Sequence, residues 1–218
     1  MSYPVWDVSQ RLVHWLFPIL IGFSWWSAEN DRMQWHAYAG YALLALVIWR
    51  LLWGFVGSHY ARFGQFWPSL SRLRSYMNRG DDSDLGHNPL GALSVFTLLL
   101  LILIQAVSGL FNTDELFLDG PLVVIASDKV IELSSEIHEL GWLLLQVFIA
   151  LHLAAITWYR FVKKRNLVRA MWFGKGVPKL SEHRPRSVLC ALSLLIGVVL
   201  IGWGLGSLLP EPEPLYYW

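Results

Sequence analysis

The sequence predicts an all-α integral membrane protein, a four-helix transmembrane bundle followed by a fifth, C-terminal transmembrane helix. Of its 218 residues, 55% are hydrophobic and only 15% are charged, and the mean hydropathy is +0.44. Five apolar stretches approach the roughly 20 residues that a helix needs to cross a bilayer. Because the backbone in lipid must satisfy its own hydrogen bonds, each stretch is expected to be helical.

The five stretches cover about 12 to 28, 35 to 57, 89 to 111, 137 to 162 and 188 to 209. Little positive charge precedes the first stretch and no small-residue cleavage site follows it, so we interpret it as a membrane span and not a signal peptide. Asn88 is expected to cap the third helix, where Pro89 loses no hydrogen bond. We expect residues 1–180 to form the four-helix membrane domain and residues 181–218 to add the fifth helix and a short outer tail.

Charge is distributed unevenly between the connections. Two loops carry the positive residues, namely Arg62, Arg72, Arg74 and Arg79 in one and Lys163, Lys164, Arg165, Arg169, Lys175, Lys179, Arg184 and Arg186 in the other. The opposite connections are short or acidic. Positive loops stay in the cytoplasm, so we expect the N-terminus inside and the C-terminus outside. The net charge of +1 gives no bulk basicity for binding nucleic acid.

Four of the seven histidines lie in the predicted spans or at their ends. A single histidine in lipid is often functional, although it also serves as a polar contact between helices. His138 and His152 are 14 residues apart on one predicted helix, which places them about 21 Å apart along the axis and nearly on one face. This spacing predicts two stacked sites.

Each of these histidines needs a partner at the same depth on another helix. Counted inward from the acidic residues at the outer boundary, His36 and His138 lie five and two residues deep, whereas His14 and His152 lie 15 and 16 residues deep. The predicted pairs are therefore His36 with His138 near the outer surface and His14 with His152 near the inner surface. Each pair is expected to clamp a flat macrocycle between two helices.

Haem explains these pairs better than other metal sites. Zinc favours clustered ligands with Cys or carboxylates, and a copper or iron triad needs a third ligand. Two imidazoles complete the coordination of a haem iron and leave no open position for oxygen or substrate, which selects electron transfer. The single cysteine, Cys190, excludes a Cys-x-x-Cys-His attachment, so two non-covalent b haems are expected.

Other residues are weaker candidates. Gly40 and Gly141 each lie one turn from a predicted ligand and would let a macrocycle approach the backbone, although close helix packing would explain them equally well. Arg50 is 14 residues after His36, so it is expected near the inner pair and able to bind a haem propionate. The alternative for Arg50 is that its side chain snorkels to the inner surface.

Polar residues at the inner side form a candidate quinone site: His59, Arg62, His87 and Asn88. Ordinary polar residues at helix ends would explain them as well. His183 lies in a basic loop, where we expect it to be solvated.

The chain resembles the bacterial cytochrome b561 family, particularly its b-type cytochrome subunits of nickel-iron hydrogenases, from about Trp6 to about Phe173. The motifs that carry the resemblance are Arg11-Leu-Val-His14-Trp15, His36-Ala-Tyr-Ala-Gly40, Arg50-Leu-Leu-Trp53-Gly-Phe-Val-Gly57, Tyr60-Ala-Arg62, Gly86-His87-Asn88-Pro89-Leu-Gly91, Ile137-His138-Glu139 and Leu151-His152. The resemblance implies two bis-histidine b haems with the same cross-helix pairing, in a bacterial inner membrane. It also implies electron exchange between membrane quinone and a partner. The fifth apolar span and the short loop at 27–34 depart from the common pattern.

Three functions compete. The first is an electron conduit between quinone and a periplasmic redox partner, either a c-type cytochrome or a hydrogenase-like oxidoreductase complex of which this chain is the membrane subunit. The second is a self-contained quinone oxidoreductase that acts on a small species such as superoxide at the outer haem. The third is an anchor or transporter without haem, in which the histidines only bridge helices. The absence of a soluble catalytic domain in the sequence favours the conduit.

Overall fold

The structure, a computed structural model, describes residues 3–79, 88–113, 118–174 and 183–210. Its helices are α1 (Val8–Glu29), α2 (Met33–Val56), α3 (Leu70–Arg79), α4 (Pro89–Gly109), α5 (Asp128–Phe161), α6 (Leu167–Phe173) and α7 (Val188–Gly206). Three short 3-10 turns, η1 (His59–Ala61), η2 (Phe63–Gln65) and η3 (Val123–Ile125), lie in the connections. Thr113 and Asp119 form an isolated bridge.

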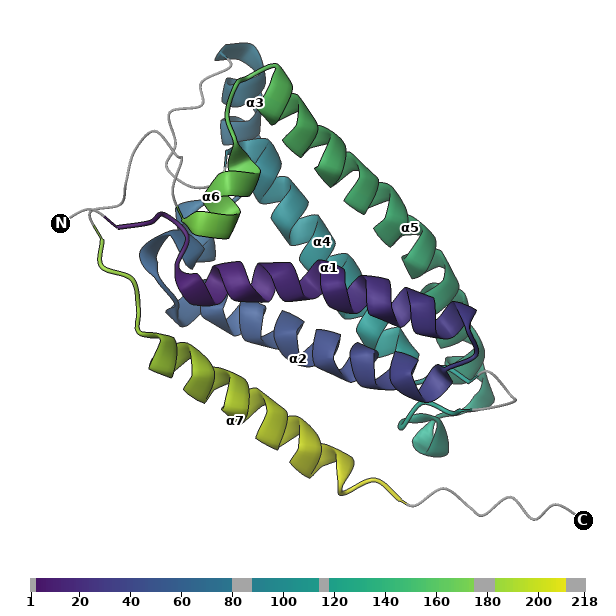
Figure 1. The fold of residues 1–218 in the computed structure, drawn as a ribbon. Coiled ribbons are helices and arrows are strands. Elements are labelled where there is room, and N and C mark those ends of the chain that lie inside the picture. Colours follow the sequence, from purple (N-terminus) through teal and green to yellow (C-terminus); the bar gives the residue numbers. More distant parts are fainter. Residues whose placement is uncertain (1–2, 80–87, 114–117, 175–182, 211–218) are drawn as a thin grey trace, which may run out of the picture.

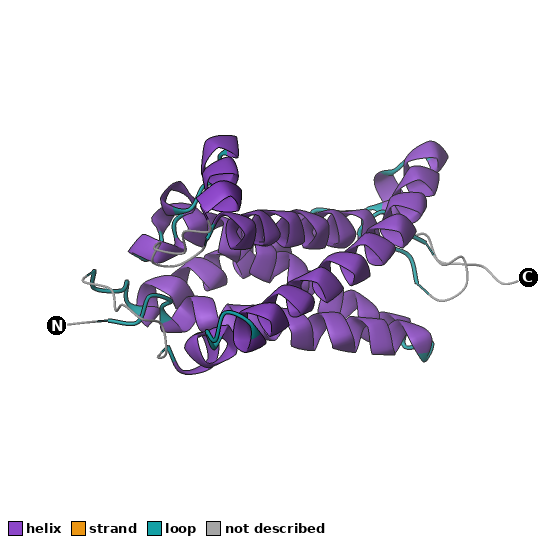
Figure 2. Cartoon of the chain, turned by 90° about the horizontal axis from the view of Figure 1, so that it is seen from above, coloured by secondary structure: helices purple, strands orange, loops and turns teal. Residues whose placement is uncertain are grey.

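Two helical hairpins form the bundle. α1 packs along α2, α4 packs along α5, and α2 joins the hairpins through its contact with α4. α7 lies against the other side of α2 (Figure 1). Seen from above, the bundle is elongated along its helices, and some of the helices cross others obliquely (Figure 2).

The two ends of the bundle differ in charge. α1 and α4 end, and α2 and α5 begin, at the end that carries Glu29, Asp31, Asp119 and Asp128, which we name the acidic end. The other end carries Arg62, Arg72, Lys163, Lys164 and Arg186, and we name it the basic end. These are the predicted outer and inner sides.

Four of the described helices are long and apolar enough to cross a membrane: α2, α4, α5 and α7. The outward faces of α5 and α7 carry large apolar side chains that are mostly exposed. Leu151 on α5 is 57% exposed and Trp203 on α7 is 74% exposed. Such surfaces are stable in lipid but not in water.

α1, the first predicted span, is not among those four helices. Its inward face carries buried polar residues, Ser9, Gln10 and Ser27, and these lower its average hydropathy. The opposite face is a stripe of exposed apolar side chains at helical spacing: Leu12, Leu16, Ile19, Phe23 and Trp26. With 22 residues, α1 is about 33 Å long, close to the roughly 30 Å of a hydrocarbon core.

The helix boundaries partly match the predicted ones. The Asn88 side chain accepts a hydrogen bond from the Gly91 amide and Pro89 is the first helical residue, which confirms the predicted start of α4. α5 begins at Asp128, not near 137, because its polar first turns continue the same helix beyond the apolar run. The connections at the basic end contain two helices that we did not predict, α3 and α6.

A pair of buried tryptophans attaches α7 to the bundle. Trp49 and Trp53 on α2 are 1% and 0% exposed, and their rings stack with centroids 5.2 Å apart. Trp49 Nε1 donates to the Ala191 carbonyl of α7 at 2.9 Å, and Trp53 Nε1 donates to Asp7 Oδ2 at 3.2 Å. Asp7 also caps α1, so one stack of rings ties α7 and the start of α1 to α2.

The Trp49→Phe variant tests this attachment. Phenylalanine keeps an aromatic ring but loses the Nε1–H donor, and removal of one buried hydrogen bond costs about 1 kcal/mol. We expect a lower thermal unfolding midpoint in detergent and faster proteolysis between α6 and α7. The matched control is Trp203→Phe, at an exposed position on α7. Equal behaviour of the two variants would contradict this role for Trp49.

Candidate haem-binding site

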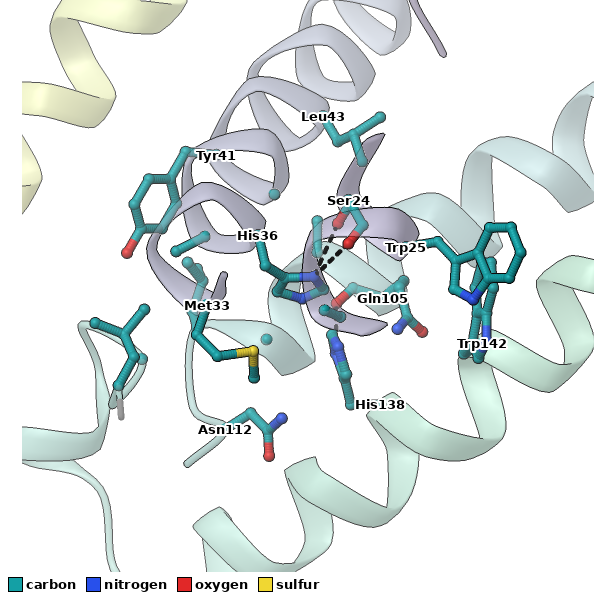
Figure 3. A pocket seen from close by; sticks show the side chains of 18 of the residues that line it. Ser24, Trp25, Met33, His36, Tyr41, Leu43, Gln105, Asn112, His138 and Trp142 are labelled. Atoms are coloured by element: carbon teal, nitrogen blue, oxygen red, sulfur yellow. Dashed lines mark hydrogen bonds between the residues drawn. The ribbon is translucent and has the colours of Figure 1, made fainter. Parts of the chain in front are cut away.

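The structure brings His36 and His138 together at the acidic end. Their rings approach each other from α2 and α5 (Figure 3), with centroids 6.1 Å apart and planes at 73°. Both line a cavity of about 310 Å³ between α1, α2, α4 and α5. A volume of this order is typical of ligand pockets.

The Nδ1 atoms of this pair already have partners. His36 Nδ1 lies 2.9 Å from the Ser24 carbonyl oxygen, and His138 Nδ1 lies 3.1 Å from the Gln105 carbonyl oxygen. A carbonyl oxygen only accepts, so each Nδ1 carries the proton and donates it. The unprotonated Nε2 atoms are then available to a metal, and hydrogen bonds of this kind orient metal-binding imidazoles.

The second pair, His14 and His152, lies toward the basic end. The ring of His14 on α1 is 6.5 Å from the ring of His152 on α5, with planes at 49°. His152 Nδ1 lies 3.2 Å from the Ser94 hydroxyl of α4. His14 Nδ1 is buried without a hydrogen-bond partner among the described residues.

These distances fit haem. An imidazole nitrogen binds iron at about 2 Å and lies about 1 Å from its ring centre, so two axial imidazoles put their ring centres about 6 Å apart. Among the described residues, no group of three or more His, Cys, Asp or Glu gathers as a metal site. Pairs of imidazoles therefore suit a metal that brings its own equatorial ligands.

A buried cation on α2 also fits a haem. Arg50 is 5% exposed, and its Nη1 and Nη2 atoms have no hydrogen-bond partner among the described residues. Buried donors are rarely left unsatisfied. The propionates of a haem are negatively charged acceptors that could bind the Arg50 guanidinium. Because Arg50 is buried over the Phe63 ring, at 4.9 Å, the alternative that it snorkels to the surface does not describe its conformation.

Comparison with known proteins identifies the family of the chain. The family model described as prokaryotic cytochrome b561 matches residues 5–174. The chain belongs to this family. It is therefore an integral membrane b-type cytochrome, and its family binds haem b and transfers electrons in the membrane.

Two curated relatives carry a more specific name. A "Probable Ni/Fe-hydrogenase B-type cytochrome subunit" of Bradyrhizobium diazoefficiens is 25% identical over 162 residues, which cover 64% of each chain. A protein of the same name from Azotobacter chroococcum mcd 1 is 26% identical over 155 residues, 62% of this chain and 64% of its own length. The match thus spans less than two thirds of either relative. No solved structure matches the chain.

The glycines of the cytochrome serve different purposes. A Cβ at Gly40 would meet nothing within 4 Å, and Gly40 lines the cavity, so its surroundings leave space for a macrocycle. A Cβ at Gly141 would meet the Gln105 side chain, so close packing of α4 and α5 accounts for this glycine. Gly109, which we did not predict, lies beside His138: a Cβ there would be 3.1 Å from Cε1 of the imidazole.

The candidate quinone residues are only partly assembled. Arg62 Nη2 lies 3.4 Å from Nδ1 of His59, to which it donates. His183, expected to be merely solvated, stacks on His59 with ring centroids 3.8 Å apart. Asn88 caps α4 and contacts the Tyr159 hydroxyl, whereas His87 lies outside the described residues. Partial burial, followed by His183 and Arg62, lowers the pKa of His59 below its ordinary value.

A side chain at Gly109 should disturb the pair at the acidic end. We expect Gly109→Val to displace the His138 ring and lower the haem content of the purified protein, measured by the pyridine haemochrome assay. Gly22→Val is the matched control, because a Cβ at that helical glycine meets nothing within 4 Å. Full haem content in Gly109→Val would show that His138 need not hold its position.

Proposed function

We propose that the chain is a dihaem cytochrome that transfers electrons across the bacterial cytoplasmic membrane. His36 and His138 would hold one haem b, and His14 and His152 would hold the other. Haem b supplies a one-electron couple, and two axial imidazoles leave the iron no site for substrate. The observation that carries the proposal is the presence of two imidazole pairs at two depths, each with ring centroids near 6 Å.

The spacing of the pairs suits transfer across a bilayer. His138 and His152 are 14 residues apart on α5, a continuous helix of 34 residues, so their levels differ by about 21 Å. That distance is much of a hydrocarbon core about 30 Å thick. With haems at these two levels, one electron transfer from haem to haem would carry an electron most of the way across the membrane.

At the acidic end we propose a periplasmic redox protein as partner, a c-type cytochrome or hydrogenase-like oxidoreductase subunits. The names of the two relatives favour a hydrogenase-like complex. Glu29, Asp119 and Glu139 border the cavity at this end. Negative charge speeds encounter with a basic partner and repels an anion, so this lining argues against superoxide as the substrate.

At the basic end we propose a quinone site that includes His59, Arg62 and Asn88, with His87 as a further candidate. The lowered pKa of His59 favours its neutral imidazole, and the neutral ring is the form that accepts a proton from a quinol. Arg62 and His183 adjoin the same ring. We therefore add His183 to the candidates.

Two haems per chain are the direct expectation. The pyridine haemochrome assay should return two haems, and acid acetone should extract both because nothing covalent retains them. His138→Ala should remove the haem at the acidic end and His152→Ala the one at the basic end, each leaving about half of the haem. One haem in the unmodified protein, or loss of both haems in each variant, would contradict the paired assignment.

We also propose five membrane crossings, α1, α2, α4, α5 and α7, with the N-terminus cytoplasmic and the C-terminus periplasmic. The apolar stripe on α1 supports its inclusion, and the basic loops set the orientation. Reporter fusions after Arg79, after Asp119 and at the C-terminus should report inside, outside and outside. An inside signal at the C-terminus would mean that α7 does not cross.

A further inference from the structure

The two imidazole pairs lie in opposite electrostatic surroundings. The cavity around His36 and His138 is lined by three carboxylates, Glu29, Asp119 and Glu139, and by no Lys or Arg among the described residues. A buried cation lies near the other pair. The difference concerns the environment alone, because the proposed axial ligands are imidazoles at both ends.

Contacts between α1 and α2 place Arg50 at the second pair. The helices are antiparallel, and residues whose numbers sum to 60 face each other: Ser24 contacts His36 and Asp7 contacts Trp53. By this register Arg50 is level with position 10 of α1, one turn from His14 toward the basic end. It is 5% exposed, so little solvent screens its charge.

The buried carboxylate of Asp7 interacts with Arg50 and offsets part of its charge. Both Asp7 oxygens also accept hydrogen bonds, from the Gln10 amide and from Trp53 Nε1, and these neutral donors leave the charge of Asp7 in place. Arg11, one turn before His14, adds a second positive charge and donates to the Trp172 carbonyl at 2.8 Å. The net charge of these three groups is positive.

The hydrogen bonds of the imidazoles also favour ferric iron more strongly at the acidic end than at the basic end. At the acidic end both Nδ1–H groups donate to backbone carbonyls, of Ser24 and Gln105. Such bonds make an imidazole a more basic ligand, which favours ferric iron. At the basic end His152 contacts a hydroxyl, and His14 Nδ1 has no partner among the described residues.

We propose that the haem at the basic end has the higher reduction potential of the two, and that Arg50 is the residue chiefly responsible. Reduction removes one positive charge from the iron, so a nearby cation favours the ferrous state whereas carboxylates favour the ferric state. The proposal rests on the two-haem function above. Its consequence is that a single electron shared by the haems resides mostly on the one beside the candidate quinone site.

A spectroelectrochemical titration of the purified holoprotein tests the ordering. The unmodified protein should titrate as two components. Arg50→Gln should shift only the higher component downward, changing its ferrous-to-ferric ratio at fixed potential by about tenfold, or about 59 mV for one electron. Arg50→Lys should restore most of the shift because it keeps the charge, and Arg74→Gln, at an exposed position on α3, should cause none.

Substitutions at the acidic end test the ordering of the two potentials independently. Glu29→Gln keeps an oxygen for the hydrogen bond from Trp25 Nε1 but removes the charge, so it should raise only the lower component. Glu132→Gln, an exposed α5 substitution outside the cavity lining, is its control. The haem retained by His138→Ala should titrate above the haem retained by His152→Ala.

The outcomes separate the two proposals. If the chain binds two haems and Arg50→Gln shifts the lower component, or neither component, the ordering is wrong while the dihaem function stands. If the haem retained by His138→Ala titrates below that of His152→Ala, the ordering is likewise overturned. A single haem per chain would instead overturn the function on which the inference rests.

Discussion

The arrangement of the bundle depends on one constraint: two histidines on α5 must each meet an imidazole from the α1–α2 hairpin at the same depth. His138 meets His36 and His152 meets His14, with ring centroids 6.1 and 6.5 Å apart. A shift of either hairpin by one helical turn, about 5.4 Å, would separate both pairs at once. The four histidines thus fix how far α1, α2 and α5 are shifted along their axes and rotated about them relative to one another.

Polar groups in the apolar interior support these four rings. Ser24 from α1 and Ser94 and Ser108 from α4 contact Nδ1 atoms of imidazoles on the neighbouring helices. Each contact leaves Nε2 directed elsewhere, and each would be expensive to leave unsatisfied in lipid. Ser24 is therefore a polar residue of α1 that belongs to the site.

Helical periodicity was enough to predict the pairing from the sequence. A spacing of 14 residues is nearly four turns, and acidic boundary residues give a depth scale, so the partners of His138 and His152 could be chosen by counting. The start of α4 was predictable for a similarly local reason, because Asn88 and Pro89 carry the signal themselves.

Features that depend on long-range contacts were not predictable in this way. The stacking of His183 on His59 joins residues 124 positions apart, and the bond from Trp49 to the Ala191 carbonyl spans 142 positions. The interpretation of Gly141 required the position of Gln105 on another helix, and the burial of Arg50 required the position of Phe63. The short helices α3 and α6 lack the long apolar run that marks a span.

The position of iron in an experimental structure would show whether the four imidazoles hold two haems. An anomalous difference map recorded at the iron edge should show two peaks per chain, one midway between the His36 and His138 rings and one midway between the His14 and His152 rings. The peaks should be about 20 Å apart, as the 14-residue spacing on α5 requires. A single peak, or iron bound away from these four imidazoles, would contradict the central claim.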